Sequence, residues 1–166
     1  MRIVAVVGPG GIGKTSLLVQ LVAELKRRGL SVAVIKHCSR GFSLDHQGKD
    51  SWRLREAGSD GVGLVSPEET AIIQRKSDDV GDVRLAASHF LNMDIVLVEG
   101  RRPVKDIPKV ELLRKGVAEK VTTPLGELAA VVSDFDIDIP RPVYHFGQIR
   151  EIADFLEKDP RVDMDR

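Results

Sequence analysis

The stretch Gly8-Pro9-Gly10-Gly11-Ile12-Gly13-Lys14-Thr15 decides the fold of this chain. It contains a glycine, four further residues and then Gly-Lys-Thr, which is the pattern of the loop that binds nucleoside triphosphates. An apolar run from Ile3 to Val7 precedes it, and a segment with helical periodicity from Ser16 to Leu25 follows it. Because the motif requires the order strand, glycine loop, helix, both flanks favour a phosphate-binding loop over a simple glycine-rich turn.

The residues of this loop have separate expected roles. Backbone N–H groups would surround the phosphates, and the helix N-terminus would add its positive dipole end. Lys14 would reach the β- and γ-phosphates, and the hydroxyl of Thr15 would bind Mg²⁺. The residues that we expect to bind the nucleotide here are Gly8, Gly10, Gly11, Ile12, Gly13, Lys14, Thr15 and Ser16.

The length and charge of the chain restrict the possible classes of protein. Its 166 residues suffice for one domain with a sizeable core. Lys and Arg total 25, as do Asp and Glu, so no overall attraction to nucleic acid or membrane is indicated. Cys38 is the only cysteine, which excludes an intrachain disulfide and suits a reducing compartment. With no signal-like leader and no apolar run of ~18 residues, the sequence predicts a cytoplasmic protein.

Strand and helix patterns alternate along the chain. Residues 31–35 form a second predicted strand, and strand–helix–strand in this order predicts a parallel pair with a right-handed crossover. The pair 61–65 and 70–74 either forms a hairpin or extends the main sheet. We therefore expect an α/β fold, a three-layer P-loop NTPase-like domain with a mostly parallel central sheet over residues 1–158, and then a polar, solvated tail at 159–166. Other predicted strands are 95–98, 110–113, 128–132 and 143–146, and other predicted helices are 50–57, 79–91 and 148–157.

In an open α/β sheet, ligands bind beyond the carboxyl ends of the strands. Glu99 leaves the strand 95–98 at that edge, whereas Asp94 enters it at the opposite edge and is expected to be a cap or surface residue. Glu99 is the expected second acidic residue of a phosphate site, holding Mg²⁺ through water or orienting an attacking water, unless it only caps or forms a salt bridge. Lys14 and Glu99 are the candidate catalytic residues, and Thr15 and Glu99 are the candidate metal ligands.

Two further residues end the second strand at the same edge. Lys36 could approach a phosphate, and His37 could act as an acid, a base or a metal ligand near neutral pH. His46 and Cys38 follow nearby in the sequence and invite a metal hypothesis, but their spacing lacks a zinc-site pattern. A hydrogen-bonded loop histidine is an equally good interpretation of His37.

Several charged residues could either form an anion-binding site or lie on the solvated surface. Arg53 and Arg55 lie near the start of the short helix 50–57, where they could clamp an anion in bidentate fashion or simply face water. Arg101 follows Glu99 and has the same ambiguity. The candidate nucleotide-binding residues outside the loop are accordingly Lys36, His37, Lys49, Asp50, Arg101 and Asp134.

Asp134 follows the strand 128–132 and offers a means of recognising a base. Its carboxylate could accept hydrogen bonds from N1–H and the exocyclic amine of guanine, which adenine cannot offer together. An adenine would leave the carboxylate unpaired, so discrimination between the bases could be large. No Asn-Lys-x-Asp guanine motif is present, and a turn aspartate is the alternative reading.

Taken together, these motifs resemble those of the molybdopterin-guanine dinucleotide biosynthesis protein B family. The likeness extends in order across nearly the whole chain through Gly8–Thr15, Lys36-His37, Gly48-Lys49-Asp50-Ser51, Arg55-Glu56-Ala57-Gly58, Leu97-Val98-Glu99-Gly100, Lys109-Val110-Glu111-Leu112 and Ser133-Asp134. The resemblance implies a GTP-binding P-loop protein with slow GTP hydrolysis, which forms a homodimer. It also implies a partner, the guanylyltransferase that attaches GMP to molybdopterin during maturation of the molybdenum cofactor.

The chain departs from the family pattern at three places. Many relatives have further histidines where this chain has Ser39-Arg40, a common proline is Gln47 here, and an aromatic after Glu-Gly is Arg101. These changes affect any metal or cofactor contact of that loop and leave the phosphate site intact. Two other functions remain open: a small-molecule or nucleoside kinase, and a metallochaperone GTPase using His37 and His46.

Overall fold

The computed structural model describes residues 2–38, 40–75, 83–100 and 107–162. Within these ranges, no helix is long and apolar enough to cross a membrane. The elements in chain order are β1 (Arg2–Val7), α1 (Lys14–Arg27), β2 (Val32–Lys36), α2 (Asp50–Glu56), β3 (Gly61–Val65), β4 (Thr70–Gln74), α3 (Val83–Ser88), β5 (Ile95–Gly100), β6 (Lys109–Leu113), β7 (Leu128–Ser133), β8 (Val143–His145), α4 (Ile149–Lys158) and the 3₁₀ helix η1 (Pro160–Val162).

Six strands form one parallel sheet in the order β2-β5-β1-β6-β7-β8. Each neighbouring pair in this sheet is parallel, so all carboxyl ends lie at one edge. The strand β1 lies near the middle, between β5 and β6. This arrangement confirms the predicted α/β P-loop NTPase-like fold, and it places the glycine loop at the centre of the ligand edge.

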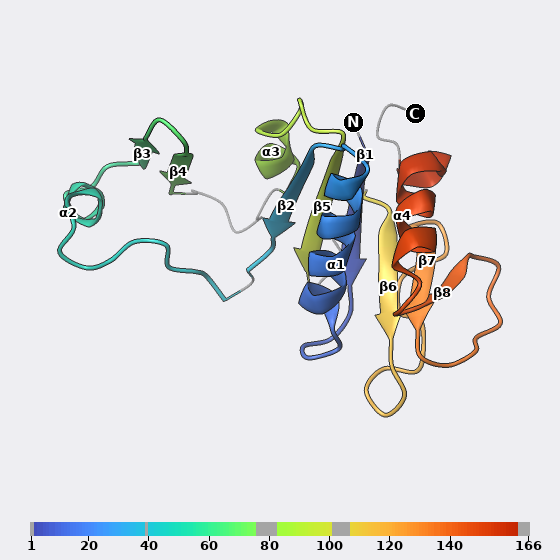
Figure 1. Cartoon of the computed structure of the whole chain (residues 1–166). Helices are drawn as coiled ribbons and strands as arrows, with labels where there is room; N and C mark the ends of the chain where they lie inside the picture. Colours follow the sequence, from blue (N-terminus) through green and yellow to red (C-terminus); the bar gives the residue numbers. More distant parts are fainter. Residues whose placement is uncertain (1, 39, 76–82, 101–106, 163–166) are drawn as a thin grey trace. The chain divides into compact units, whose positions relative to one another are not determined.

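The sheet is covered on both faces because its strands are apolar on both sides. Val4 and Val6 of β1 pack in a core cluster with leucines of α1 and with Ile152 and Leu156 of α4. The alternate residues Ile3 and Ala5 belong to a second cluster on the other face, together with residues of α3. Figure 1 shows α1 and α4 side by side along the sheet. Helices, sheet and helix therefore make the three predicted layers.

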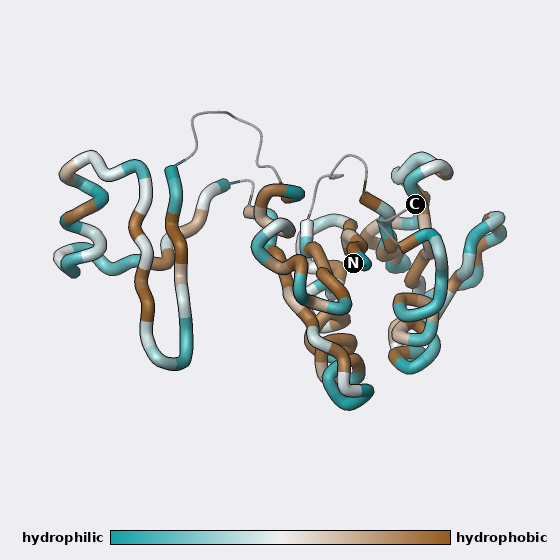
Figure 2. Tube along the Cα trace, turned by 90° about the horizontal axis from the view of Figure 1, so that it is seen from above, coloured by the Kyte–Doolittle hydropathy of each residue, from teal (hydrophilic) through white to brown (hydrophobic). Residues whose placement is uncertain are grey.

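Residues 38–81 form a second compact unit, separate from the unit made by residues 1–37 and 82–166. Its strands β3 and β4 pair antiparallel in a two-stranded sheet of their own, so the predicted pair is a hairpin. Hydrophobic stretches run along both hairpin strands (Figure 2), yet Val62, at 8% exposed, is the only buried hydrophobic residue among the described residues of this unit. The prediction of a single nucleotide-binding domain over residues 1–158 stays a prediction.

Two segments differ in detail from their sequence patterns. The structure has α3 at Val83–Ser88, and the predicted residues 79–82 lie outside the described ranges. After Ser88 the chain continues in tighter turns, in which Phe90 N donates to Ala87 O (2.9 Å). At the C-terminus, Val162 is fully buried in the main core, so the described part of the predicted tail packs against the sheet unit rather than being wholly solvated.

Candidate functional site

The glycine loop leaves the buried strand β1 and enters α1 through backbone conformations that favour glycine. Gly8 has a φ of 148° and Gly13 a φ of 107°. A Cβ added at Gly8 would lie 3.2 Å from Ile12 Cγ2 and 3.3 Å from Leu112 O, so the chain turns where a side chain has little room. Glycines at these two positions therefore allow the main chain itself to form a close-fitting cradle.

The first turn of α1 has features that favour the binding of an anion. Gly13 is the N-cap residue, no side chain caps the helix, and no acidic residue lies in its first turn. The N–H groups of this turn have no intrahelical acceptor, and the helix dipole is positive here. Lys14 is only 7% exposed, and its Nζ donates to Gly8 O (2.8 Å) and Pro9 O (2.7 Å). The loop thus holds a cation beside the helix N-terminus, an arrangement suited to phosphate.

A cluster of polar side chains adjoins the loop at the end of β5. The Thr15 hydroxyl donates to Glu99 Oε1 at 2.6 Å, and Lys36 Nζ lies 3.6 Å from Glu99 Oε2. The strands β2 and β5 are paired in register, Lys36 opposite Glu99, which explains this meeting. The structure therefore brings together three of the predicted site residues, from α1, β2 and β5.

This cluster fits the chemistry of Mg²⁺. Thr15 and Glu99 offer a hydroxyl and a carboxylate within hydrogen-bond distance of each other. Mg²⁺ usually keeps several waters and takes one or two protein oxygens together with phosphate oxygens. A bound Mg²⁺ would neutralise phosphate charge here, and Thr15 and Glu99 are the residues that would hold it, directly or through water.

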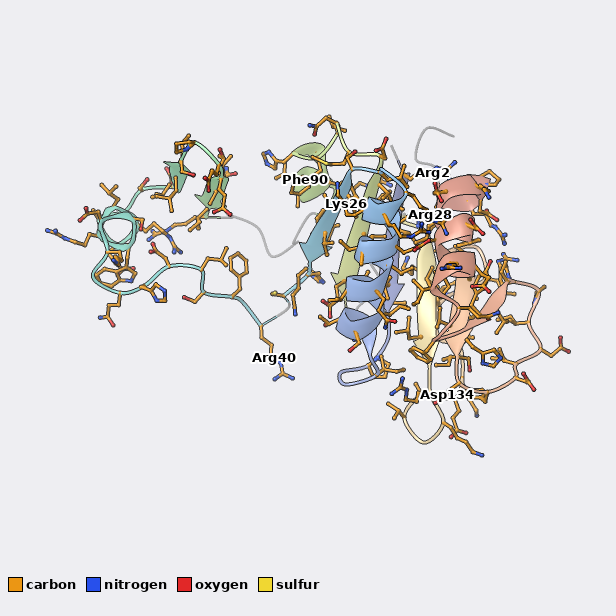
Figure 3. All side chains as sticks on the ribbon, viewed as in Figure 1. Arg2, Lys26, Arg28, Arg40, Phe90 and Asp134 are labelled. Carbon is orange, nitrogen blue, oxygen red and sulfur yellow. The ribbon has the colours of Figure 1, made fainter. Side chains whose placement is uncertain are left out.

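Asp134 follows β7 at the same edge of the sheet as the glycine loop. Figure 3 labels it at the carboxyl ends of the strands, with Arg2 at the opposite edge. Its Oδ1 accepts a hydrogen bond from Lys115 N (2.9 Å), and its Oδ2 lies 3.7 Å from Arg114 Nε. Asp134, the predicted base-recognition residue, therefore lies at the same edge of the sheet as the glycine loop. The contact between its Oδ2 and Arg114 is too long for a hydrogen bond.

Sequence reasoning overlooked two residues of this region, Arg114 and Phe146. The guanidinium of Arg114 stacks over the Phe146 ring, with Cζ 4.5 Å from the ring centroid. A Cβ built on Gly13 would lie 3.5 Å from Arg114 Nη2 and 3.7 Å from Phe146 Cε1. Both residues follow strands, β6 and β8, so the rule that selected Glu99 and Asp134 would also have selected them.

Three other candidates lie outside the unit that carries this cluster or outside the described residues. Lys49 and Asp50 belong to the second unit, where Lys49 is the N-cap of α2, and Arg101 lies outside the described residues. His37 follows β2, and its buried Nδ1 has no hydrogen-bond partner among the described residues. Its backbone N–H donates to Glu99 O (2.8 Å).

Three observations in the described part of the chain concern the alternative functions and Asp94. No group of three or more His, Cys, Asp or Glu that could hold a metal occurs in the part of the chain that the structure describes. Lys36, one of the basic residues that could hold the acceptor of a kinase, has its Nζ 3.6 Å from Glu99 Oε2. Asp94, at the opposite edge, accepts hydrogen bonds from Ser31 N (2.7 Å) and Oγ (2.6 Å), as expected for a cap.

An ion-pair network holds the C-terminal end of α1 against α4. Arg28, just after α1, pairs with Glu24, with Asp154 (2.8 Å) and with Glu157. Hydrogen bonds from Arg27 and then Arg28 lower the pKa of Glu24 to about 2. The hydrogen bond from Arg28 likewise lowers the pKa of Asp154. These carboxylates stay charged over the physiological pH range and hold the C-terminal end of the loop-bearing helix.

Comparisons with known proteins point to one family. The family model described as molybdopterin guanine dinucleotide synthesis protein B matches residues 3–134. A curated relative from Haemophilus influenzae, named molybdopterin-guanine dinucleotide biosynthesis adapter protein, is 38% identical and covers 93% of this chain and 87% of its own. A relative of the same name from Escherichia coli is 30% identical, covering 88% of this chain and 86% of its own.

Solved structures of similar proteins share the fold of this chain. A crystal structure of a molybdopterin-guanine biosynthesis protein B superposes with a TM-score of 0.70 at 27% identity, covering 93% of this chain and 95% of that chain. A homologue from Bacillus stearothermophilus superposes with a TM-score of 0.63 at 23% identity, covering 94% and 95%, which speaks for the fold alone. From its motifs, its geometry and these matches, the chain belongs to the molybdopterin guanine dinucleotide synthesis protein B family.

Proposed function

We propose that this protein is a GTP-binding adaptor of molybdenum-cofactor biosynthesis with weak GTPase activity. The single observation that carries the proposal is the arrangement of one edge of the sheet. The glycine loop with Lys14 lies between the Thr15–Glu99 pair on one side and Asp134 on the other. The loop would bind the triphosphate, Thr15 and Glu99 would hold Mg²⁺, and Asp134 would read guanine.

Slow hydrolysis follows from how Glu99 is engaged. A residue that orients an attacking water needs an oxygen available to it. One carboxylate oxygen of Glu99 accepts from Thr15 at 2.6 Å, and the other faces Lys36 at 3.6 Å. Because both carboxylate oxygens of Glu99 already face other groups, neither is available to orient water, and we infer that the bound nucleotide persists longer than in an efficient NTPase.

The biological role is inferred from the relatives. Proteins that match most of this chain are named molybdopterin-guanine dinucleotide biosynthesis adapter proteins. We infer that this protein acts in the cytoplasm, where it would deliver or retain GTP for the guanylyltransferase that attaches GMP to molybdopterin. Slow hydrolysis suits that task, because an adaptor must hold the nucleotide until its partner uses it.

The second unit supports a homodimer. Leu64, Val65 and Ile72 on the β3–β4 hairpin are 47%, 82% and 64% exposed. An isolated two-stranded sheet with exposed apolar side chains is marginally stable and favours pairing with another chain. We infer that a second copy of this protein covers the hairpin. A Val65→Lys variant that stays dimeric in sedimentation experiments would refute this assignment.

Nucleotide titrations and turnover assays test the central proposal. With Mg²⁺ present, we expect GTP to bind more tightly than ATP, and we expect hydrolysis to be slow. Equal affinity for the two nucleotides, or binding of ATP alone, would remove the guanine assignment. For the role, immobilised protein loaded with GTP should retain the guanylyltransferase from a purified mixture better than the nucleotide-free protein. Retention that does not respond to GTP would contradict the adaptor role.

A further inference from the structure

Three side chains meet beside the last glycine of the phosphate loop, and each comes from the end of a different strand. They are Arg114 after β6, Asp134 after β7 and Phe146 after β8. Arg114 stacks on Phe146 and lies 3.7 Å from Asp134, and the would-be Cβ of Gly13 touches both Arg114 and Phe146. A nucleotide whose phosphates occupy the loop would therefore have its base within reach of this group.

The backbone holds Arg114 firmly in this position. Arg114 pairs with Ala118 across a tight turn, in which Arg114 N donates to Ala118 O and Ala118 N donates to Arg114 O, both at 2.9 Å. Lys115 N donates to Asp134 Oδ1, which ties the end of β6 to the end of β7. The two charged groups are thus positioned relative to each other by the fold, independently of their own weak contact.

The guanidinium has an unfilled hydrogen-bonding position. Arg114 Nε is buried and makes no hydrogen bond within the described residues. The nearest carboxylate oxygen, Asp134 Oδ2, stands 3.7 Å away, which is an ion-pair distance but beyond a hydrogen bond. A buried donor without an acceptor is unfavourable, so a ligand that brings an acceptor to it would be stabilised.

Guanine carries the matching acceptors and donors side by side. Its O6 and N7 are acceptors that a guanidinium binds in bidentate fashion, and its neighbouring N1–H and amine are donors that a carboxylate binds. Adenine instead presents an amine donor at position 6, which would face the guanidinium unfavourably. Resting on the proposed function, we propose that Arg114 reads O6 and N7 of guanine while Asp134 reads N1–H and the amine. Arg114 is then a specificity-determining residue of this site.

The close spacing of the two groups agrees with this assignment. In guanine, O6 is carried by C6, which is bonded to N1, so the groups that bind O6 and N1–H must themselves be neighbours. Arg114 and Asp134 are neighbours without a mutual hydrogen bond. A guanidinium that only neutralised the carboxylate would be expected to form a bidentate pair with it.

The first test measures the binding of a base analogue to the wild-type protein, and variants of Arg114 provide the second. We expect wild-type protein to bind 7-deaza-GTP, which lacks the N7 acceptor, several-fold more weakly than GTP. Arg114→Ala should weaken GTP binding about 10- to 100-fold, leave ATP binding nearly unchanged, and bind GTP and 7-deaza-GTP equally. Arg114→Lys should recover little of this loss, because an ammonium lacks the planar fork. Lys120→Ala removes an exposed cation from the same loop and is the matched control.

The outcomes separate this inference from the proposed function. If the wild-type protein does not prefer GTP to ATP, the proposed function fails and this inference fails with it. If Asp134→Asn abolishes the preference while Arg114→Ala keeps it, the inference alone is refuted. An equal loss for GTP and ATP in Arg114→Ala would assign Arg114 to phosphate instead. Equal binding of GTP and 7-deaza-GTP to the wild-type protein would overturn the inference even if the variants fail to fold.

Discussion

Replacing Lys14 with alanine is the sharpest perturbation of the phosphate site. The ammonium is 7% exposed and is held against the loop by two carbonyls at 2.8 and 2.7 Å, so it is already positioned where phosphates would bind. Hydrogen bonds that involve a charged group contribute about 1.5–3 kcal/mol each. Losing one or two such bonds to phosphate oxygens, ~2.7 kcal/mol in total, corresponds to a roughly 100-fold weaker Kd for GTP.

Thermal unfolding with and without GTP measures this change. At a GTP concentration of about 100 times the Kd, the wild-type protein should gain ~2.7 kcal/mol, which raises the Tm by about 5–10 °C for a domain of this size. At the same concentration, a 100-fold weaker variant gains only ~0.4 kcal/mol, or about 1 °C. Because each variant is compared with itself, any change in the unliganded Lys14→Ala protein cancels.

The control for this experiment removes a lysine that is far more exposed. Lys158 on α4 is 75% exposed and forms only a 3.5 Å contact with Asp154. Lys158→Ala should keep the full wild-type shift. If Lys14→Ala shows the same GTP-induced rise in Tm as the wild-type protein, Lys14 does not bind phosphate and the assignment of the loop is wrong.

Three further perturbations test the packing and the charges around the site. The fully buried ammonium of Lys109 lies 2.7 Å from Glu127. Glu127→Ala leaves this ammonium without its carboxylate partner, so the free energy of unfolding measured in urea should fall by about 3 kcal/mol. Lys109→Met removes the buried charge itself and should change the free energy of unfolding very little. Gly8→Ala forces a side chain into a φ of 148° and should lower the unfolding free energy by about 1–3 kcal/mol. Because the folded pKa of Glu24 is depressed to about 2, its stabilising effect should be full above its ordinary pKa of 4.5 and be lost progressively as the pH falls to 2. Glu24→Gln should flatten that part of the Tm profile, and an unaltered profile would contradict the ion-pair assignment.

Much of the fold could be predicted because its signals are local. The run from Ile3 to Val7 is apolar at every position, as a strand buried on both faces must be, and it is the central strand. The rule that ligands bind at carboxyl ends also predicted that Glu99 and Asp134 lie at the same edge of the sheet as the glycine loop, where the structure has them. In contrast, the pairing of β3 with β4 as a separate hairpin depends on non-local contacts, so the pattern alone left two possibilities open.

The site was predicted less completely because side-chain partners depend on strand order. The contact of Lys36 with Glu99 arises because β2 pairs with β5, two strands that are far apart in the sequence. Arg114 and Phe146 were missed for the same reason: they meet only because β6, β7 and β8 are successive strands of the sheet. Neither residue belongs to a sequence motif, although Arg114 directly follows one predicted strand and Phe146 is the last residue of another.

The most direct measurement is a crystal structure of the protein with Mg²⁺ and a non-hydrolysable GTP analogue. The account predicts that the triphosphate lies over Gly8 to Thr15, with Lys14 contacting phosphate oxygens and Mg²⁺ near Thr15 and Glu99. The guanine should lie at the end of β7, with its N1–H and amine directed at Asp134. A nucleotide bound elsewhere, or a glycine loop that stays empty at saturating analogue, would contradict the account.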